Sequence, residues 1–307
     1  MRALMIFALV LCQTPIFSQM KTLQERLGYP KETKLLIIHA DDIGVAQTEN
    51  AATIYAMEKG VVNSGSIMVP CPWFPEIAAY AVSHPELDLG VHLVLTSEWK
   101  HYKWGPVLHQ EVKSLTTDKG FLTDGSVDLS KVAKVEDVEK ELRAQIKRAI
   151  QFGVDPTHLD SHMGMIFRDA EYVKIYIKLG HEFKIPVMIT QQIVDAYESS
   201  GIKKMLTEKD VVIDDIYTAA TYDYAKGMSK YYTNLLNNLQ PGVSTILIHT
   251  AYDNDEMKAV TIDHPDWGSA WRQADFDFFT SDVCKKLLET NNIQLITWRE
   301  MRDKLVR

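Results

Sequence analysis

Short apolar runs alternate with segments of helical periodicity along most of the chain. Residues 34–39 are almost uninterruptedly apolar, which is typical of a strand buried on both faces. Residues 135–152 repeat apolar positions every three or four residues before Gly153, as an amphipathic helix does. The predicted strands lie at 34–39, 66–69, 87–95, 158–160, 186–190, 245–248 and 293–297, and the predicted helices at 47–59, 73–82, 135–152, 171–181 and 276–289.

This alternation predicts parallel β/α units and therefore an α/β fold. Six or seven units favour a (β/α) barrel-like architecture, either a distorted barrel or a seven-stranded TIM-type barrel. An open dinucleotide-binding sheet is disfavoured because no glycine-rich fingerprint follows the first strand. Residues 97–134 are polar and irregular and are interpreted as an insertion or lid-like excursion. No linker or repeat divides residues 20–307, so we expect a single domain there.

The first nineteen residues have a different character. Arg2 precedes an apolar run from Ala3 to Cys12, and a polar stretch leads to Ser18. This pattern predicts a signal peptide over residues 1–19, cleaved near Ser18, and the apolar run is too short to span a bilayer. We therefore expect the protein to be exported, to a periplasm or to the medium. The alternative is an apolar N-terminal helix that packs on the body of the protein.

Composition narrows the classes of partner. The chain has 41 acidic and 33 basic side chains, and a net charge of −8 argues against nucleic acid. Three Cys are too few for a disulfide-built scaffold or an all-thiolate zinc site. Cys71 and Cys284 could pair in an oxidising compartment, but the sequence does not place them within bridging distance. It also does not decide between a monomer and a homodimer.

Ionisable side chains collect at the ends of the predicted strands, where barrel enzymes carry their chemistry. They are Asp41 and Asp42 after the first strand, His92 in the third, His158, Asp160 and His162 in the fourth, and His249 after the late strand. Two imidazoles and one carboxylate form a common hydrolytic metal site that leaves positions for water and substrate. Asp160 is suited to hold the outer nitrogen of a histidine ligand, and the second carboxylate of the Asp pair is free to act as a general base. Taken singly, the Asp pair also fits a turn and each His a core position.

Other sequence features carry less chemistry. The sequence contains no Gly-x-Ser-x-Gly elbow and no phosphate-binding P-loop. His39 is given no role beyond completing the first strand. The remaining histidines are interpreted as surface residues: His84, His101, His109, His181 and His264. Five tryptophans near predicted loops suit either sugar rings or core packing: Trp73, Trp99, Trp104, Trp267 and Trp271.

Four segments together resemble the YdjC-like carbohydrate deacetylases. They are Ile-His-Ala-Asp-Asp-Ile-Gly at 38–44, Gly-Val-His-Leu at 90–93, Pro-Thr-His-Leu-Asp-Ser-His at 156–162 and Ile-His at 248–249. The resemblance extends in order from about residue 34 to residue 300. It implies a barrel-like α/β fold and a hydrolase that removes acetyl groups from N-acetylated carbohydrates such as chitooligosaccharides, releasing acetate.

The resemblance also implies roles for individual residues. Asp42, His92 and His162 would hold one divalent metal ion, with magnesium or zinc as the expected metals. Asp41 would be the catalytic base, and His249 the catalytic acid or a stabiliser of the transition state. The expected partner is accordingly a small carbohydrate substrate, with neither nucleic acid nor a membrane span.

Two further positions qualify this assignment. Arg272 resembles a family position near the site. Gly164 stands where many members have a second alternate His, so contacts with the substrate are expected to differ. Two other functions therefore stay open: a different metal-dependent hydrolase on a similar barrel, such as a phosphoesterase, and an exported carbohydrate-binding protein without activity.

Overall fold

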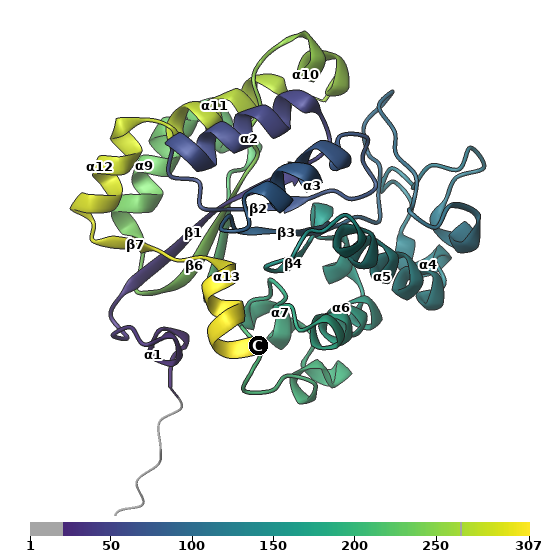
Figure 1. The fold of residues 1–307 in the computed structure, drawn as a ribbon, viewed down its shortest axis with the longest axis horizontal. Coiled ribbons are helices and arrows are strands. Elements are labelled where there is room, and N and C mark those ends of the chain that lie inside the picture. Colours follow the sequence, from purple (N-terminus) through teal and green to yellow (C-terminus); the bar gives the residue numbers. More distant parts are fainter. Residues whose placement is uncertain (1–20, 265) are drawn as a thin grey trace, which may run out of the picture.

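The computed structural model describes residues 21–264 and 266–307, so the signal peptide predicted at residues 1–19 lies outside the described residues. A parallel sheet occupies the centre (Figure 1). Its strands are β1 (Lys34–Ile43), β2 (Ser64–Ile67), β3 (Leu89–Leu93), β4 (Leu159–Ser161), β5 (Asp215–Thr218), β6 (Gly242–Ile248) and β7 (Ile293–Leu295). Six follow the order β4-β3-β2-β1-β6-β5, and β7 pairs with β1.

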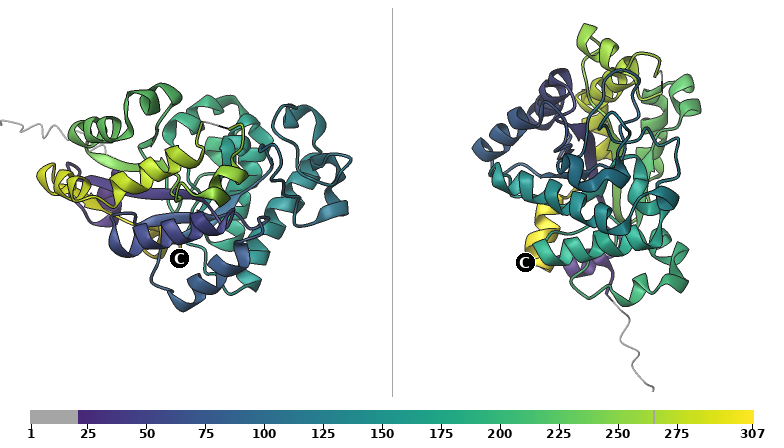
Figure 2. Two further views of the ribbon diagram at one scale, coloured as in Figure 1. Left: turned by 90° about the horizontal axis from the view of Figure 1, so that it is seen from above. Right: turned by 90° about the vertical axis from the view of Figure 1, so that its right-hand side faces the viewer.

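Helices surround the strands on the outside (Figures 1 and 2). The α-helices are α1 (Leu23–Leu27), α2 (Gln47–Lys59), α3 (Phe74–Ser83), α4 (Leu129–Val132), α5 (Val135–Gln151), α6 (Ala170–Phe183), α7 (Gln191–Ala196), α8 (Thr221–Lys226), α9 (Met228–Asn238), α10 (Asp255–Val260), α11 (Ser269–Phe279), α12 (Asp282–Thr290) and α13 (Trp298–Met301). Short 3-10 segments and one π-helical segment complete the described chain: η1 (His109–Leu115), η2 (His162–Arg168), η3 (Glu198–Ser200), η4 (Ile202–Lys204) and the π-helical η5 (Arg302–Val306). None of the helices in the described residues is both long and apolar enough to cross a membrane.

The long strand β1 organises the sheet. It pairs with β6 from Lys34 to Ala40, while its other edge pairs with β7 at the start and with β2 at the end. From Leu35 onwards every residue of β1 is buried, because neighbouring strands and helices cover both its edges and its faces. The central strand predicted from the continuous apolar run at residues 34–39 is therefore confirmed.

The sheet curves into a distorted barrel that is not closed by regular strand pairing. Between β4 and β5 the described chain forms only two isolated parallel bridges, Leu159 with Val187 and Thr190 with Ile213. The strand predicted at 186–190 is this connecting segment. The prediction of a parallel α/β fold is confirmed, whereas a regular seven-stranded TIM-type barrel is not shown.

Two other sequence predictions need correction. The helix predicted at 276–289 is two helices, α11 and α12, because the Ser281 hydroxyl accepts a hydrogen bond from the Cys284 amide and begins a new helix. The short edge strand β5 was not predicted, since its four residues are only partly buried and lack an apolar run. Cys71 and Cys284 are free, buried thiols that belong to separate apolar clusters.

Candidate active site

The site begins at an irregularity near the end of β1. The pairing of β1 with β2 shifts register between Ala40 and Ile43, and Asp42 has a positive φ of 64°. In a regular strand, successive side chains point to opposite faces. Here the irregularity brings carboxylate oxygens of both Asp41 and Asp42 to the same histidine, at 4.0 and 3.8 Å from Nε2 of His249.

Asp42, His92 and His162 form a compact buried group. Oδ1 of Asp42 lies 3.4 Å from Nε2 of His92 and 3.1 Å from Nδ1 of His162, and these two nitrogens are 3.3 Å apart. His92 comes from β3 and His162 directly follows β4, so parallel strands deliver both rings to the same edge of the sheet. The side chains predicted as metal ligands therefore converge, with donor atoms close enough together to surround one cation.

A carboxylate lies at the outer nitrogen of each of these two rings. Oδ1 of Asp160 is 2.7 Å from Nδ1 of His92, as the sequence suggested for this aspartate. Oε2 of Glu98 is 3.0 Å from Nε2 of His162, and sequence reasoning missed this contact. An acceptor at the outer nitrogen holds a proton there and turns the lone pair of the inner nitrogen inward, as metal-ligating histidines require.

The charges of this group also suit a cation. Burial lowers the pKa of His162, but the carboxylates of Glu98 and Asp42 outweigh burial and raise it to about 9. Burial raises the pKa of Asp42, but the Arg272 guanidinium and the two imidazoles outweigh burial and hold it well below its usual range. Without a metal ion the rings thus hold protons, whose places a divalent ion can take. The three donors and their surroundings fit such an ion.

Arg272 lies at the site, on α11. Its Nη2 donates to Oδ2 of Asp42 at 2.8 Å, its Nη1 pairs with Glu49 of α2, and its Nε donates to the carbonyl of Trp267. The guanidinium and both carboxylates are at most 3% exposed. Arg272 therefore holds the oxygen of Asp42 that faces away from the two histidines. The local sequence around Glu49 gives no indication that this residue contacts the site.

His39 belongs to the site, although sequence reasoning gave it no role. Its Nε2 lies 3.1 Å from Oδ1 of Asp41 and 3.0 Å from Oδ2 of Asp160, and its Nδ1 is 2.9 Å from the Ser64 hydroxyl. Burial lowers the pKa of His39, but Asp160 and Asp41 outweigh burial and raise it to about 9. A buried imidazolium thus bridges the predicted base and the carboxylate behind His92. The only sequence signal was that residues 39 and 41 share one face of a strand.

His249 completes the group on the other side of Asp41. Burial lowers the pKa of His249 to about 4, so its ring is neutral at neutral pH. Its backbone N–H donates to Oδ2 of Asp275 at 3.0 Å, and Tyr232 donates to Oδ1 of the same carboxylate at 2.7 Å. These contacts anchor the backbone at the end of β6, where the ring faces the Asp pair.

Other candidates have structural roles. His158 is fully buried outside the group of Asp42, His92 and His162, and its ring stacks on Trp298 with centroids 5.3 Å apart. A Cβ at Gly90 would lie 2.5 Å from this ring, so the glycine makes room for it. The five histidines predicted at the surface are all exposed or partly exposed.

The tryptophans serve mainly as packing. Trp99, Trp104 and Trp271 are at most 3% exposed, while Trp73 is 38% exposed and Trp267 is intermediate. The Arg272 guanidinium lies over the ring of Trp99, 5.4 Å from its centroid. Trp104 lies beside His162, with ring centroids 6.0 Å apart, so Trp99 and Trp104 wall the site without an open stacking surface, while Trp271 stacks on other aromatic rings.

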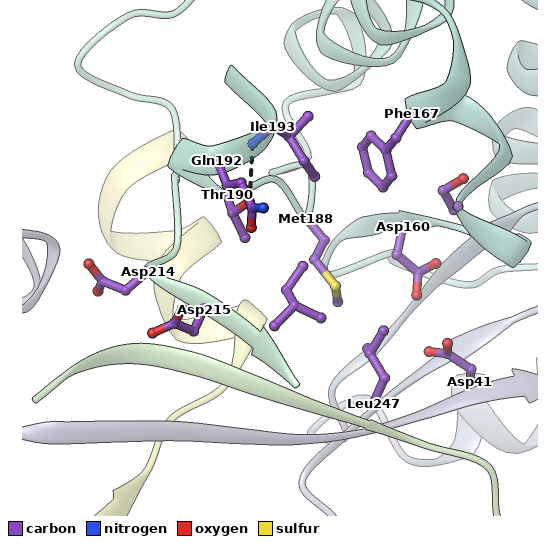
Figure 3. A pocket seen from close by; sticks show the side chains of 13 residues that line it. Asp41, Asp160, Phe167, Met188, Thr190, Gln192, Ile193, Asp214, Asp215 and Leu247 are labelled. Carbon is purple, nitrogen blue, oxygen red and sulfur yellow. Dashed lines mark hydrogen bonds between the residues drawn. The ribbon is translucent and has the colours of Figure 1, made fainter. Parts of the chain in front are cut away.

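A cavity of about 310 Å³ opens beside Asp41 (Figure 3). It extends from Asp41 and Asp160 at one end to Asp214 and Asp215 at the other. Gly164 lines it, and a Cβ there would meet only the Phe167 ring at 3.8 Å. The glycine at position 164, where many family members are expected to have a histidine, thus leaves space in the wall of this cavity.

The fold and the site define a parallel α/β protein with a buried aspartate–histidine group at the carboxyl ends of its strands. The chain matches the model of the family described as YdjC-like protein over residues 35–290. It therefore belongs to the YdjC-like family, and the expectation drawn from its motifs is confirmed.

Related proteins agree with this membership. The chain is 28% identical to a carbohydrate deacetylase of Thermus thermophilus over 293 residues, 92% of this chain and 99% of the relative. It is 28% identical to a carbohydrate deacetylase of Brevibacillus brevis over 272 residues, 87% of this chain and 99% of the relative. A crystal structure of an Enterococcus faecalis protein, whose description names cellobiose-phosphate cleavage, has a TM-score of 0.74 at 25% identity. That match covers 88% of this chain and 99% of the other, so the fold is shared almost throughout.

Proposed function

We propose that this protein is a metal-dependent carbohydrate deacetylase that removes acetyl groups from N-acetylated sugars of the chitooligosaccharide type. The observation that carries the proposal is the convergence of Asp42, His92 and His162 beside the carboxylate of Asp41, which His39 holds from the other side. The relatives named carbohydrate deacetylases support the reaction class. The substrate would be an acetamido sugar, and the products acetate and a free amino sugar.

The metal ion, magnesium or zinc, would be held by Asp42, His92 and His162. Carboxylate and imidazole donors suit both ions, and the geometry of the donors does not select one. A divalent ion there supplies Lewis acidity towards the acetyl carbonyl and the attacking water. Asp160 and Glu98 keep the two rings oriented, and Arg272 holds the other oxygen of Asp42.

Asp41 is assigned as the general base. It takes a proton from the attacking water, while the imidazolium of His39 keeps its carboxylate in place. His249 faces Asp41 across the site and is assigned to the departing amine. Its resting ring is neutral, so the proton that the departing nitrogen needs is the one Asp41 has taken from the water, passed on directly or through the ring of His249. Breakage of the amide C–N bond then leaves acetate and the amine.

The decisive experiment measures acetate release from N-acetylglucosamine oligomers by the purified chain with added divalent metal. We expect turnover by the native protein and a loss of at least about a hundredfold in kcat for Asp41→Asn, which keeps the size of the side chain and removes its basicity. His84→Asn, a surface change, serves as the control. Undiminished release by Asp41→Asn would contradict the assigned mechanism.

Export is part of the same proposal. Residues 1–19 have the pattern of a signal peptide, and a periplasmic or secreted deacetylase would meet oligosaccharides outside the cytoplasm. Expression of the full chain in a bacterial host, followed by N-terminal sequencing of the exported product, tests this. We expect the mature chain to begin near Gln19; a product that keeps Met1 and stays inside the cell would contradict it.

A further inference from the structure

The cavity beside Asp41 has walls of a distinct kind. It lies between the η2 and α7 segments on one side and β5 and β6 on the other, and its apolar lining comes from both (Figure 3). The apolar residues are Phe167, Met188, Ile193, Ile216 and Leu247. A volume of about 310 Å³ is at the lower end of the range for small-molecule sites and suits a single sugar ring.

The charged residues of this lining are all acidic. Four aspartates line the cavity: Asp41, Asp160, Asp214 and Asp215. No Lys, Arg or His is found among the described residues that line it. His39 and His92 compensate Asp160 from behind, since each ring pairs with one of its oxygens. At the far end, the hydrogen bond that Asp214 accepts within the described residues comes from the backbone N–H of Val243. The cavity therefore has acceptors at both ends and no cation of its own.

The remaining polar groups do not supply an anion site. Ser161, Thr190 and Gln192 are neutral. The Thr190 hydroxyl accepts the hydrogen bond of the Ile193 amide at the start of α7, so that amide is not left for a ligand. Proteins that bind phosphate present Arg, Lys or several free backbone N–H groups. None of these arrangements is found in the described lining of the cavity.

We propose that this cavity is the subsite for an uncharged sugar ring of the substrate and that it discriminates against sugars carrying phosphate. The inference rests on the proposed deacetylase function and adds the substrate class. Sugar hydroxyls donate to carboxylates, and the C–H faces of the ring pack on Met188 and Leu247. A phosphate dianion at the far end of the cavity faces Asp214 and Asp215, beside which the described lining holds no cation. An unphosphorylated oligosaccharide is thus the preferred substrate, in contrast to the phosphorylated disaccharide named for the Enterococcus faecalis relative.

The test compares two substrates of the metal-loaded full chain, an N-acetylglucosamine oligomer and the same oligomer carrying a 6-phosphate. We expect kcat/KM to be at least about tenfold higher for the unphosphorylated sugar, as one uncompensated like-charge contact produces. Gln192 lines the cavity and is exposed, so Gln192→Lys places a cation there without burying it. This variant should lower the preference about tenfold. Gln191→Lys, on the neighbouring exposed residue outside the lining, is the matched control and should leave the preference unchanged.

The possible outcomes distinguish a failure of the proposed subsite from a failure of the proposed deacetylase function. Equal kcat/KM for the two sugars, or an equal response to Gln191→Lys and Gln192→Lys, overturns the subsite. If neither sugar releases acetate, the proposed function fails. Calorimetric titration of both sugars into the metal-loaded protein then decides the subsite independently. The subsite is supported if the unphosphorylated sugar binds more tightly and if Gln192→Lys reduces this difference in affinity. It is overturned if both sugars bind with equal affinity.

Discussion

Oε2 of Glu98 lies 3.0 Å from Nε2 of His162, on the ring nitrogen opposite the one that approaches Asp42. Glu98 belongs to residues 97–134, which form a lobe at one end of the molecule (Figures 1 and 2). The lobe is tied to the rest of the chain by hydrogen bonds from the Trp104 indole to the carbonyl of Thr96 and from the Tyr102 hydroxyl to the carbonyl of Val45. This lobe, interpreted from the sequence as an insertion or lid, thus contributes a carboxylate to the predicted metal centre.

The contact predicts that Glu98 supports metal binding. In Glu98→Gln the carboxylate charge is lost, so the His162 ring is held less firmly and becomes a weaker ligand. We expect the affinity for a divalent ion to fall by about tenfold to a hundredfold, measured by isothermal titration calorimetry. Glu111→Gln, an exposed change in the same lobe, should leave the affinity unaltered. Equal affinities for the native chain and Glu98→Gln would show that the contact does not support the metal.

Arg272 provides a prediction about stability. It is buried between Asp42 and Glu49, so Arg272→Met leaves the buried Glu49 without a cation and leaves Asp42 with its two imidazole partners alone. We expect the free energy of unfolding of the metal-free protein to fall by about 3–5 kcal/mol in chemical denaturation. The control is Arg143→Met, which breaks partly exposed ion pairs with Glu139 and Glu182 and should cost about 1 kcal/mol or less. Similar losses of unfolding free energy in the two variants would contradict the claim that burial makes the ion pairs of Arg272 costlier to break than those of Arg143.

The sequence predicted the elements whose patterns are strong and local. The run in β1 and the periodicity of α5 gave strand and helix close to their observed bounds, because each pattern reports burial of neighbouring positions. The elements between residues 191 and 226 are short and partly exposed, so they carry little periodicity and were missed. The gap in strand pairing between β4 and β5 depends on contacts across the barrel and has no local signal.

The residues of the site likewise fall into those that the sequence predicted and those that it did not. His92 and His162 were predicted because the carboxyl ends of parallel strands meet at one edge of a sheet. Glu98 lies 64 positions from His162, and Glu49 lies 223 positions from Arg272. Such pairings arise only once the chain has folded. Sequence reasoning therefore found the inner group of the site and Asp160 beside it, and missed the more distant carboxylates Glu98 and Glu49.

His39 leads to a prediction about catalysis. Its ring fixes Asp41 from one side and Asp160 from the other, so His39→Asn leaves the proposed base without its ion-pair partner. We expect kcat for acetate release to fall by about tenfold to a hundredfold, since small displacements of a catalytic group have effects of that size. KM and the metal content, measured by elemental analysis, should change little. A loss of metal in step with activity would instead assign His39 to the metal centre.

Asp275 gives a prediction about pH. Burial raises its pKa to about 7, against hydrogen bonds from the His249 amide and Tyr232 that lower it. An aspartate in the unfolded chain has a pKa of about 3.9, so the folded state binds the extra proton between these two pH values. This contribution to stability is fully present below about pH 4 and is lost as the pH rises through about 7, with an upper bound of about 4 kcal/mol.

Asp275→Asn should remove that dependence, because an amide keeps the acceptor oxygen and resembles the protonated acid. Urea denaturation at pH 5 and pH 8 measures it: the variant should gain stability relative to the native chain as the pH rises. Asp277→Asn, an exposed change on the same helix, should alter the stability by no more than about 0.5 kcal/mol at either pH. A difference between Asp275→Asn and the native chain that stays constant from pH 5 to pH 8 would show that this carboxyl does not titrate with folding.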